Sequence, residues 1–284
     1  MHPSERIKHI REISKELSKE EWSLLDLTLK EFGLPWTDQW SGDKESYVIE
    51  MISGADDKSL LELAKHLGVA SQLESADEPE FWGNNSARIF LSHLATNKAE
   101  TTQLKEQLEK YGISAFVAHE DIEPTKEWQT EIESALASMD ALVALLAPGF
   151  KESNWCDQEV GVAIGRQLPI IPVKLGLDPY GFIGKYQAVQ GAGKTSAQLA
   201  KEIFDLFLPN PIVGPKITNA LIQQLSESYS FARSKELIGY IKQSKFVNSK
   251  HIAAMKEAVT NNSQVNGAWG VPEQIEALAK QIES

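Results

Sequence analysis

The sequence has one cysteine, no long apolar run and no excess of basic charge. Cys156 is the single cysteine among 284 residues, which excludes a disulfide framework and a multi-cysteine metal site. The longest apolar run, from Ala141 to Pro148, is far below the roughly 18 residues that a membrane span needs. The first residues, Met1 to Arg6, are polar and lack the apolar core of a signal peptide, so we expect a cytoplasmic protein.

The excess of acidic side chains excludes two classes of partner. Lys and Arg number 28 and Asp and Glu number 40, which gives a net charge of −12. Binding to nucleic-acid phosphates needs a basic surface that displaces counterions, and so does binding to anionic lipid headgroups. We therefore expect neither a nucleic-acid nor a membrane partner. The 6 histidines are scattered, without a metal-ligand spacing, so no metal is expected.

Composition divides the chain into three sections. Residues 74–83 form an acidic, proline-containing stretch without periodicity, and residues 208–215 are rich in proline. These breaks predict a helical module over residues 1–80, a central domain over 84–208 and a second helical module over 209–284. Sensing or association is the role that we expect for the two helical modules.

Apolar residues at helical spacing fill the first and third sections. Ile7 to Leu17 keep such a spacing, and Ser18 followed by Glu21 has the pattern of a capping box, which predicts that a second helix begins there. The remaining helices are expected over residues 45–52, 59–67, 217–225, 234–241, 250–259 and 272–282.

The central section alternates strands and helices. Its expected strands are almost entirely apolar, and helical patterns at 96–111, 128–139 and 153–166 separate them; the strands cover residues 87–92, 113–117, 141–146 and 170–173. Such strands are typical of a parallel sheet that is buried on both faces. We therefore expect an α/β fold with helices on both faces of the sheet. Functional loops are then expected at the carboxyl ends of the strands.

The run from Gly191 to Thr195 ends like a phosphate-binding P-loop. That motif needs a glycine five residues before Gly193, where this chain has Ala188, and it needs a buried strand before it. Residues 185–190 are short and polar instead. We therefore expect a surface loop that is capped into a helix at Thr195.

The most informative stretch lies between Ser153 and Glu159. Ser153 or Asn154 can cap a helix, so that Trp155 and Glu159 lie one turn apart on one face, just after the third strand. An acid beside an aromatic ring at this edge can bind a cationic ligand, although spacing alone favours a solvated glutamate. Cys156 lies near the same helix start, where a thiolate is favoured, but no histidine is near it in sequence, so a structural role is preferred.

Three segments resemble the TIR (Toll/interleukin-1 receptor) family. Residues 88–93 (RIFLSH) resemble its first strand, and residues 116–124 (FVAHEDIEP) resemble its second strand and BB loop. Residues 155–160 (WCDQEV) resemble the W-x-x-x-E segment of the members that cleave NAD. The resemblance covers about residues 84–208, in family order, and implies a flavodoxin-like parallel sheet.

This resemblance implies an NAD glycohydrolase of the bacterial immune-effector type, which releases nicotinamide and ADP-ribose or a cyclic isomer. NAD is then the substrate, and no cofactor is expected. The implied catalytic residue is Glu159, and the implied substrate-binding residues are Trp155, Ser92, His93 and His119. The chain departs from the pattern at Leu94 and Ala95, where some NAD-cleaving relatives have basic residues.

Cleavage of the bond between nicotinamide and ribose requires only one carboxylate. Nicotinamide leaves C1′ of the ribose as a neutral molecule because its ring nitrogen is already cationic. The second acid that protonates the leaving oxygen in glycoside hydrolysis is therefore not required. A single carboxylate can hold the ribose hydroxyls and stabilise the positive charge at C1′.

In TIR assemblies the loop that corresponds to residues 118–126 contacts a neighbouring domain, so we expect a homo-oligomer in which self-association activates the enzyme.

Two other functions stay open. The alternative is a non-catalytic TIR adaptor that acts through TIR–TIR assembly, which Leu94 and Ala95 favour. A third possibility is a flavodoxin-like module that binds a nucleotide without cleaving it.

Overall fold

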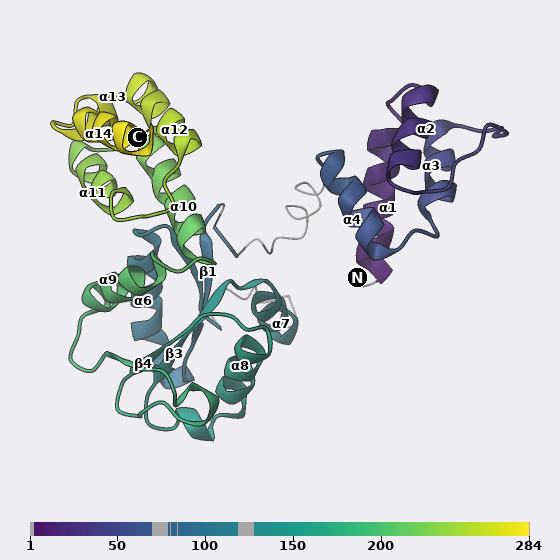
Figure 1. The fold of residues 1–284 in the computed structure, drawn as a ribbon. Helices are drawn as coiled ribbons and strands as arrows, with labels where there is room; N and C mark the ends of the chain where they lie inside the picture. Colours follow the sequence, from purple (N-terminus) through teal and green to yellow (C-terminus); the bar gives the residue numbers. More distant parts are fainter. Residues whose placement is uncertain (1–2, 70–78, 80, 84, 119–127, 284) are drawn as a thin grey trace. The chain divides into compact units, whose positions relative to one another are not determined.

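The computed structural model describes residues 3–69, 79, 81–83, 85–118 and 128–283. Two compact units make up the chain, residues 1–78 and residues 79–284 (Figure 1). Among the described residues, none of the helices combines the length and the apolar character needed to cross a bilayer.

The first unit consists of helices around their own hydrophobic core. They are α1 (Pro3–Leu17), α2 (Trp22–Glu31), α3 (Lys44–Ile52) and α4 (Asp57–His66). One apolar face of each helix supplies the core, whose fully buried members include Leu17, Leu25, Val48, Ile52 and Leu60. The helical character expected for this section is confirmed, and its bounds as a module stay a prediction.

The predicted capping box at Ser18 is wrong. The N-cap residue of α2 is Glu21, and its side chain makes no capping hydrogen bond. The hydroxyl of Ser18 donates to the carbonyl of Lys15 instead, at 3.1 Å. Ser18 therefore belongs to the end of α1, because its hydroxyl pairs backwards along the chain and not with the following turn.

The second unit is built on a five-stranded parallel sheet. Its strands are β1 (Ala87–Ser92), β2 (Ile113–Phe116), β3 (Ala141–Leu146), β4 (Ile170–Lys174) and β5 (Val189–Gln190). The strand order is β2-β1-β3-β4-β5, which is the flavodoxin-like order. The four expected strands and the expected fold class are confirmed. The fifth strand was not predicted, because it has only two residues and one of them is exposed.

Helices cover both faces of this sheet (Figure 1). Helices α6 (Lys98–Glu109) and α9 (Ser196–Phe207) lie on one face, and α7 (Trp128–Ser138) and α8 (Asn154–Gly165) lie on the other. Ile89 and Leu91 of β1 belong to the cluster that includes α6 and α9, whereas Phe90 belongs to the cluster that includes α7 and α8. Successive residues of the central strands thus point to opposite, equally buried faces, and their sequences are apolar throughout for this reason.

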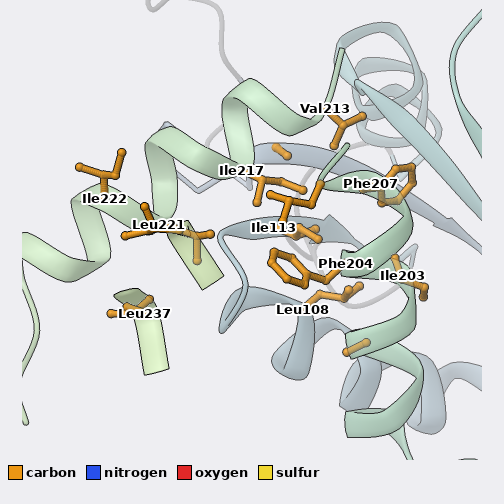
Figure 2. Close-up of a cluster of buried hydrophobic side chains, with 14 of the residues drawn as sticks. Leu108, Ile113, Ile203, Phe204, Phe207, Val213, Ile217, Leu221, Ile222 and Leu237 are labelled. Carbon is orange, nitrogen blue, oxygen red and sulfur yellow. The ribbon is translucent and has the colours of Figure 1, made fainter. Parts of the chain in front are cut away.

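The helices after residue 209 continue the hydrophobic core of the sheet. They are α10 (Gly214–Ser226), α11 (Phe231–Ile241), α12 (Ser249–Asn261), α13 (Ser263–Asn266) and α14 (Val271–Glu283). Figure 2 shows Ile217 and Leu221 of α10 beside Leu108 of α6 and Phe204 of α9, in one buried cluster. The third section is thus part of the compact unit 79–284, and the division into three modules stays a prediction.

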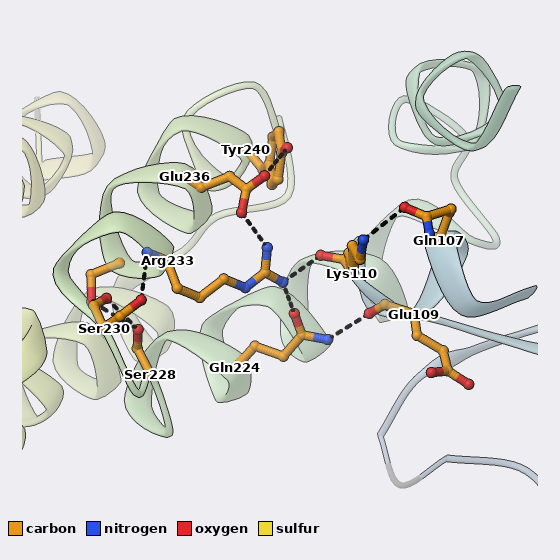
Figure 3. A network of polar contacts seen from close by, with 10 residues as sticks. Gln107, Glu109, Lys110, Gln224, Ser228, Ser230, Arg233, Glu236 and Tyr240 are labelled. Carbon is orange, nitrogen blue, oxygen red and sulfur yellow. Dashed lines mark hydrogen bonds and ion pairs between the residues drawn. The ribbon is translucent and has the colours of Figure 1, made fainter. Parts of the chain in front are cut away.

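Polar contacts join these helices to the carboxyl end of α6 (Figure 3). The guanidinium of Arg233 donates to the carbonyl of Lys110 at 2.5 Å and to the side-chain oxygen of Gln224 at 2.7 Å. Gln224 in turn donates to the carbonyl of Glu109 at 2.9 Å. The last carbonyls of a helix lack partners within it, so α10 and α11 satisfy the end of α6 while they cover the core.

The loop from Gly191 to Thr195 behaves as a helix cap, as expected. The hydroxyl of Thr195 accepts the backbone N–H of Gln198, and the side chain of Gln198 accepts the backbone N–H of Thr195. A Cβ atom on Gly191 would lie 2.6 Å from Cγ1 of Val173, so this glycine allows the loop to pack against β4. Packing and capping explain these residues without a phosphate ligand.

Candidate functional site

The topology of the sheet marks the carboxyl ends of β1 and β3 as the expected position of a ligand. After β1 the chain enters α6 on one face, and after β3 it enters α8 on the other face. Adjacent parallel strands that connect to opposite faces leave an opening between them, where ligands bind in open α/β folds. Ser92 is the last residue of β1 and pairs in register with Ala144 of β3.

Helix α8 brings a glutamate to this position. The hydroxyl of Ser153 caps the helix by accepting the backbone N–H of Cys156. Glu159 follows in the second turn, and only 5% of it is exposed. The hydroxyl of Ser92 donates to Oε2 of Glu159 at 2.5 Å. The structure therefore joins two predicted site residues that are far apart in the sequence.

Burial controls the ionisation of Glu159. Desolvation raises the pKa of this carboxyl from 4.5 to about 7, and the hydrogen bond from Ser92 partly opposes this rise. A charged carboxylate is poorly solvated in such a site, whereas a hydroxyl donor stabilises its charge. Glu159 is therefore near the midpoint of its titration at neutral pH. The alternative of a solvated surface glutamate is wrong for this residue.

Trp155 lies one helical turn before Glu159, as its spacing predicts. Its environment differs, because 41% of Trp155 is exposed while Glu159 is buried. The indole is thus at the surface of the domain, whereas the carboxylate is buried. A planar base could stack on the indole.

Cys156 is a buried structural thiol. Its sulfur lies 3.6 Å from the carbonyl oxygen of His93, to which it donates. Burial raises the pKa of this thiol, so the protonated form is favoured over a nucleophilic thiolate. The preference for a structural role over a catalytic one agrees with this environment.

His93 is held by the backbone at the end of β1. Its Nδ1 atom lies 2.7 Å from the carbonyl oxygen of Leu91. A carbonyl can only accept, so Nδ1 carries a proton in this contact. Leu94, at the departure from the family pattern, packs against the cluster that includes α7 and α8. His119 lies outside the described residues.

One residue near the start of α8 was not predicted. The hydroxyl of Tyr180 donates to Oδ1 of Asp157 at 2.5 Å, and Nζ of Lys151 lies 5.7 Å from the centre of the Tyr180 ring. This contact attaches the segment after β4 to the first turns of α8. No motif signals it, because Tyr180 stands in an irregular segment well after α8. Within the described ranges, no three potential metal-ligating side chains gather at one place.

The chain was compared with known proteins. A model of the TIR domain matches residues 89–203. A probable 2′ cyclic ADP-D-ribose synthase of Brachypodium distachyon is 22% identical over 99 residues, which are 34% of this chain and 44% of that protein. The chain thus spans less than half the length of this curated relative. The TIR domain of a Toll-related receptor of Hydra magnipapillata has 18% identity and a TM-score of 0.34, covering 43% of this chain and 95% of that one.

The matched residues coincide with the architecture described above. Residues 89–203 extend from β1 through most of α9, and they include Ser92, Trp155 and Glu159. The segments that carry the resemblance in the sequence thus lie in one domain with the expected parallel sheet. The chain contains a TIR domain.

Proposed function

We propose that this chain is an NAD glycohydrolase, in which Glu159 is the catalytic residue that assists cleavage of the bond between nicotinamide and ribose. The observation that carries the proposal is a buried carboxylate at the carboxyl ends of β1 and β3, hydrogen-bonded to Ser92 at 2.5 Å. The TIR domain and the activity named for the relative from Brachypodium distachyon support NAD chemistry at the level of the family.

The reaction breaks one bond at C1′ and forms another. The electron pair of the C1′–N bond goes to the ring nitrogen, and nicotinamide leaves as a neutral molecule. A carboxylate in a low-dielectric site stabilises the positive charge that develops at C1′ more strongly than it would in water. Water, or a hydroxyl of the same ADP-ribose unit, then adds to C1′ and loses a proton. With a pKa of about 7, Glu159 can accept that proton.

The proposed substrate contacts follow the resemblance. We propose that Trp155 stacks on the nicotinamide or the adenine, since its exposed indole offers an aromatic surface one helical turn from Glu159. Ser92, His93 and His119 are the other residues that we propose for the NAD site. NAD is the substrate in this scheme, and no cofactor takes part.

We further propose that TIR–TIR contacts between copies of the chain activate the enzyme, in a cytoplasmic immune or cell-death response. An active site that is completed by association would keep an NAD-consuming enzyme inactive until a trigger assembles it. A net charge of −12 disfavours nucleic acid and anionic membranes as the surface for this assembly.

Incubation of the purified full chain with NAD tests these proposals. We expect nicotinamide together with ADP-ribose or a cyclic isomer, separated by chromatography. The release per molecule is expected to rise with protein concentration and with a crowding agent, because association favours the active form. Strictly linear scaling in a demonstrably monomeric sample would remove activation by self-association.

The same experiment separates the competing functions. No nicotinamide at any protein concentration would favour the non-catalytic adaptor. Stable binding of NAD without release would favour a nucleotide-binding module. In both cases the proposed hydrolase activity would be wrong.

A further inference from the structure

The backbone and the side chain of Ser92 are both held in place by the fold. The residue is fully buried, and the parallel pairing of β1 with β3 holds its backbone opposite Ala144. Its hydroxyl points to the carboxylate of Glu159, at 2.5 Å from Oε2. Both atoms of this contact belong to regular secondary structure, so the geometry is set by the fold and not by a loop.

Glu159 depends on this contact for its charged form. Among the described residues, Ser92 supplies the one side-chain hydrogen bond of Glu159. A buried carboxylate without a donor is costly and becomes protonated instead. The hydroxyl of Ser92 is thus the group that favours the ionised carboxylate against its burial.

The neighbouring ionisable groups do not replace Ser92. The helices and strands that pack most closely against α8 are η2 (Phe150–Glu152), β3, α7 and β1, and Tyr180 of the segment after β4 contacts α8 through Asp157. β3 has no ionisable residue, and α8 itself carries Cys156 and Asp157 besides Glu159. The ionisable residues of η2, α7 and β1 are Lys151, Glu152, Glu131, Glu133 and Arg88. Burial and the hydrogen bond from Ser92 are the causes of the pKa shift of Glu159, and none of these groups contributes to it.

We propose that Ser92 is a positioning residue that acts through Glu159, because its hydroxyl fixes the orientation of the carboxylate and stabilises its charge. This inference rests on the proposed hydrolase and assigns to Ser92 a role that does not require contact with NAD. Without the hydroxyl, the carboxylate takes up a proton at a higher pH and loses its fixed orientation. Fewer molecules then carry the charge that C1′ requires.

The test compares three variants of the full chain. Ser92→Ala removes the donor, Ser92→Thr retains it at the addition of one buried methyl group, and Ser92→Cys replaces it with a weak donor of similar size. Ser114→Ala is the matched control, because Ser114 is a buried serine in β2 whose hydroxyl accepts the backbone N–H of Gly83 at 2.8 Å. Thermal unfolding checks that each variant folds.

Two readouts are measured as a function of pH. The first is nicotinamide release, and the second is the titration of the Glu159 carboxyl by 13C NMR, assigned with the Glu159→Gln variant. For Ser92→Ala we expect kcat at neutral pH to fall about tenfold or more, since a hydrogen bond to a charged group is lost. We also expect the Glu159 midpoint to rise by about one pH unit, and the acidic limb of the rate profile to move with it. KM should change little, and an unchanged KM separates this positioning role from the direct contact with NAD that the resemblance implies for Ser92, whose loss would raise KM.

The other variants make the result specific. Ser92→Thr should restore the midpoint, Ser92→Cys should lie between wild type and Ser92→Ala, and Ser114→Ala should leave the midpoint and kcat unchanged. The proposal is overturned if the Glu159 midpoint is the same in wild type and in both donor-deficient variants. A wild-type chain that releases no nicotinamide would contradict the hydrolase, whereas the link between Ser92 and Glu159 is decided by the NMR titration alone.

Discussion

Replacing Glu159 with glutamine is expected to lower nicotinamide release from NAD about 100- to 1,000-fold, which is the effect of losing one preorganised charge-stabilising group. Glutamine has nearly the shape of glutamate and retains an oxygen that can accept the hydrogen bond from Ser92. The change therefore removes the negative charge and preserves the packing. The loss is expected in kcat, since the charge on C1′ appears only in the transition state.

Chromatographic detection of nicotinamide measures this effect. The control is Glu133→Gln, which removes a carboxylate from an exposed position on α7 and is expected to leave the rate unchanged. Thermal unfolding of Glu159→Gln checks that the domain remains folded. Unchanged release by folded Glu159→Gln would eliminate Glu159 from the catalytic role.

The same substitution is expected to stabilise the fold at neutral and alkaline pH. Burial raises the pKa of Glu159 from 4.5 to about 7, so the folded state holds this proton more tightly than the unfolded state does. The contribution of Glu159 to the free energy of unfolding therefore falls as the pH rises from about 4.5 to 7, and stays low above that range. The cost of the buried charge reaches about 3 kcal/mol as an upper limit.

Glutamine is neutral at every pH and does not carry this cost. The Glu159→Gln variant should therefore match the wild type near pH 4.5 and exceed it at pH 8, with a Tm that is higher by about 5 to 10 °C. Thermal unfolding of both proteins across this pH range measures the difference in their stability. The contributions of all other titrating groups are the same in both proteins and cancel. A difference that does not depend on pH, or a wild type that is the more stable protein at pH 8, would contradict the buried, charged carboxylate.

The sheet could be predicted because its signal is local. Four apolar runs separated by helical patterns specify parallel strands that are buried on both faces, and the structure confirms each of them. β5 escaped prediction because two residues at the edge of a sheet bury too little apolar surface to leave a pattern. The prediction at Ser18 was wrong because a serine hydroxyl can bond to the following turn or to the preceding one. The sequence pattern does not distinguish the two, and Ser18 bonds to the preceding turn.

The sequence pattern could not predict which distant segments pack against one another. The periodicity of α10 predicts an apolar face, and that face lies against Leu108 and Phe204 in the core of the TIR domain. A helical pattern states which residues are buried but not what they are buried against. Arg233 is an example on the polar side, because one of its partners is the backbone carbonyl of Lys110, and a carbonyl carries no signal in a sequence.

The sequence names candidate residues for the site, which stay predictions, but not the contacts between them. The W-x-x-x-E pattern proposes Trp155 and Glu159, and the resemblance proposes Ser92. The hydrogen bond between Ser92 and Glu159 depends on the register of β1 with β3 and on the place of α8, which no local pattern contains. The burial of Glu159 beside an exposed Trp155 likewise follows from the packing of α8 on the sheet.

The pH dependence of nicotinamide release by the wild-type chain tests most directly whether a desolvated carboxylate carries the reaction. If ionised Glu159 is required, kcat/KM should rise about tenfold per pH unit on the acidic side and level off above a midpoint near 7, which is the pKa of this carboxyl. A rate that is flat from about pH 5 to 8 would show that the reacting group titrates as an ordinary solvated carboxylate, in contradiction to the role of Glu159.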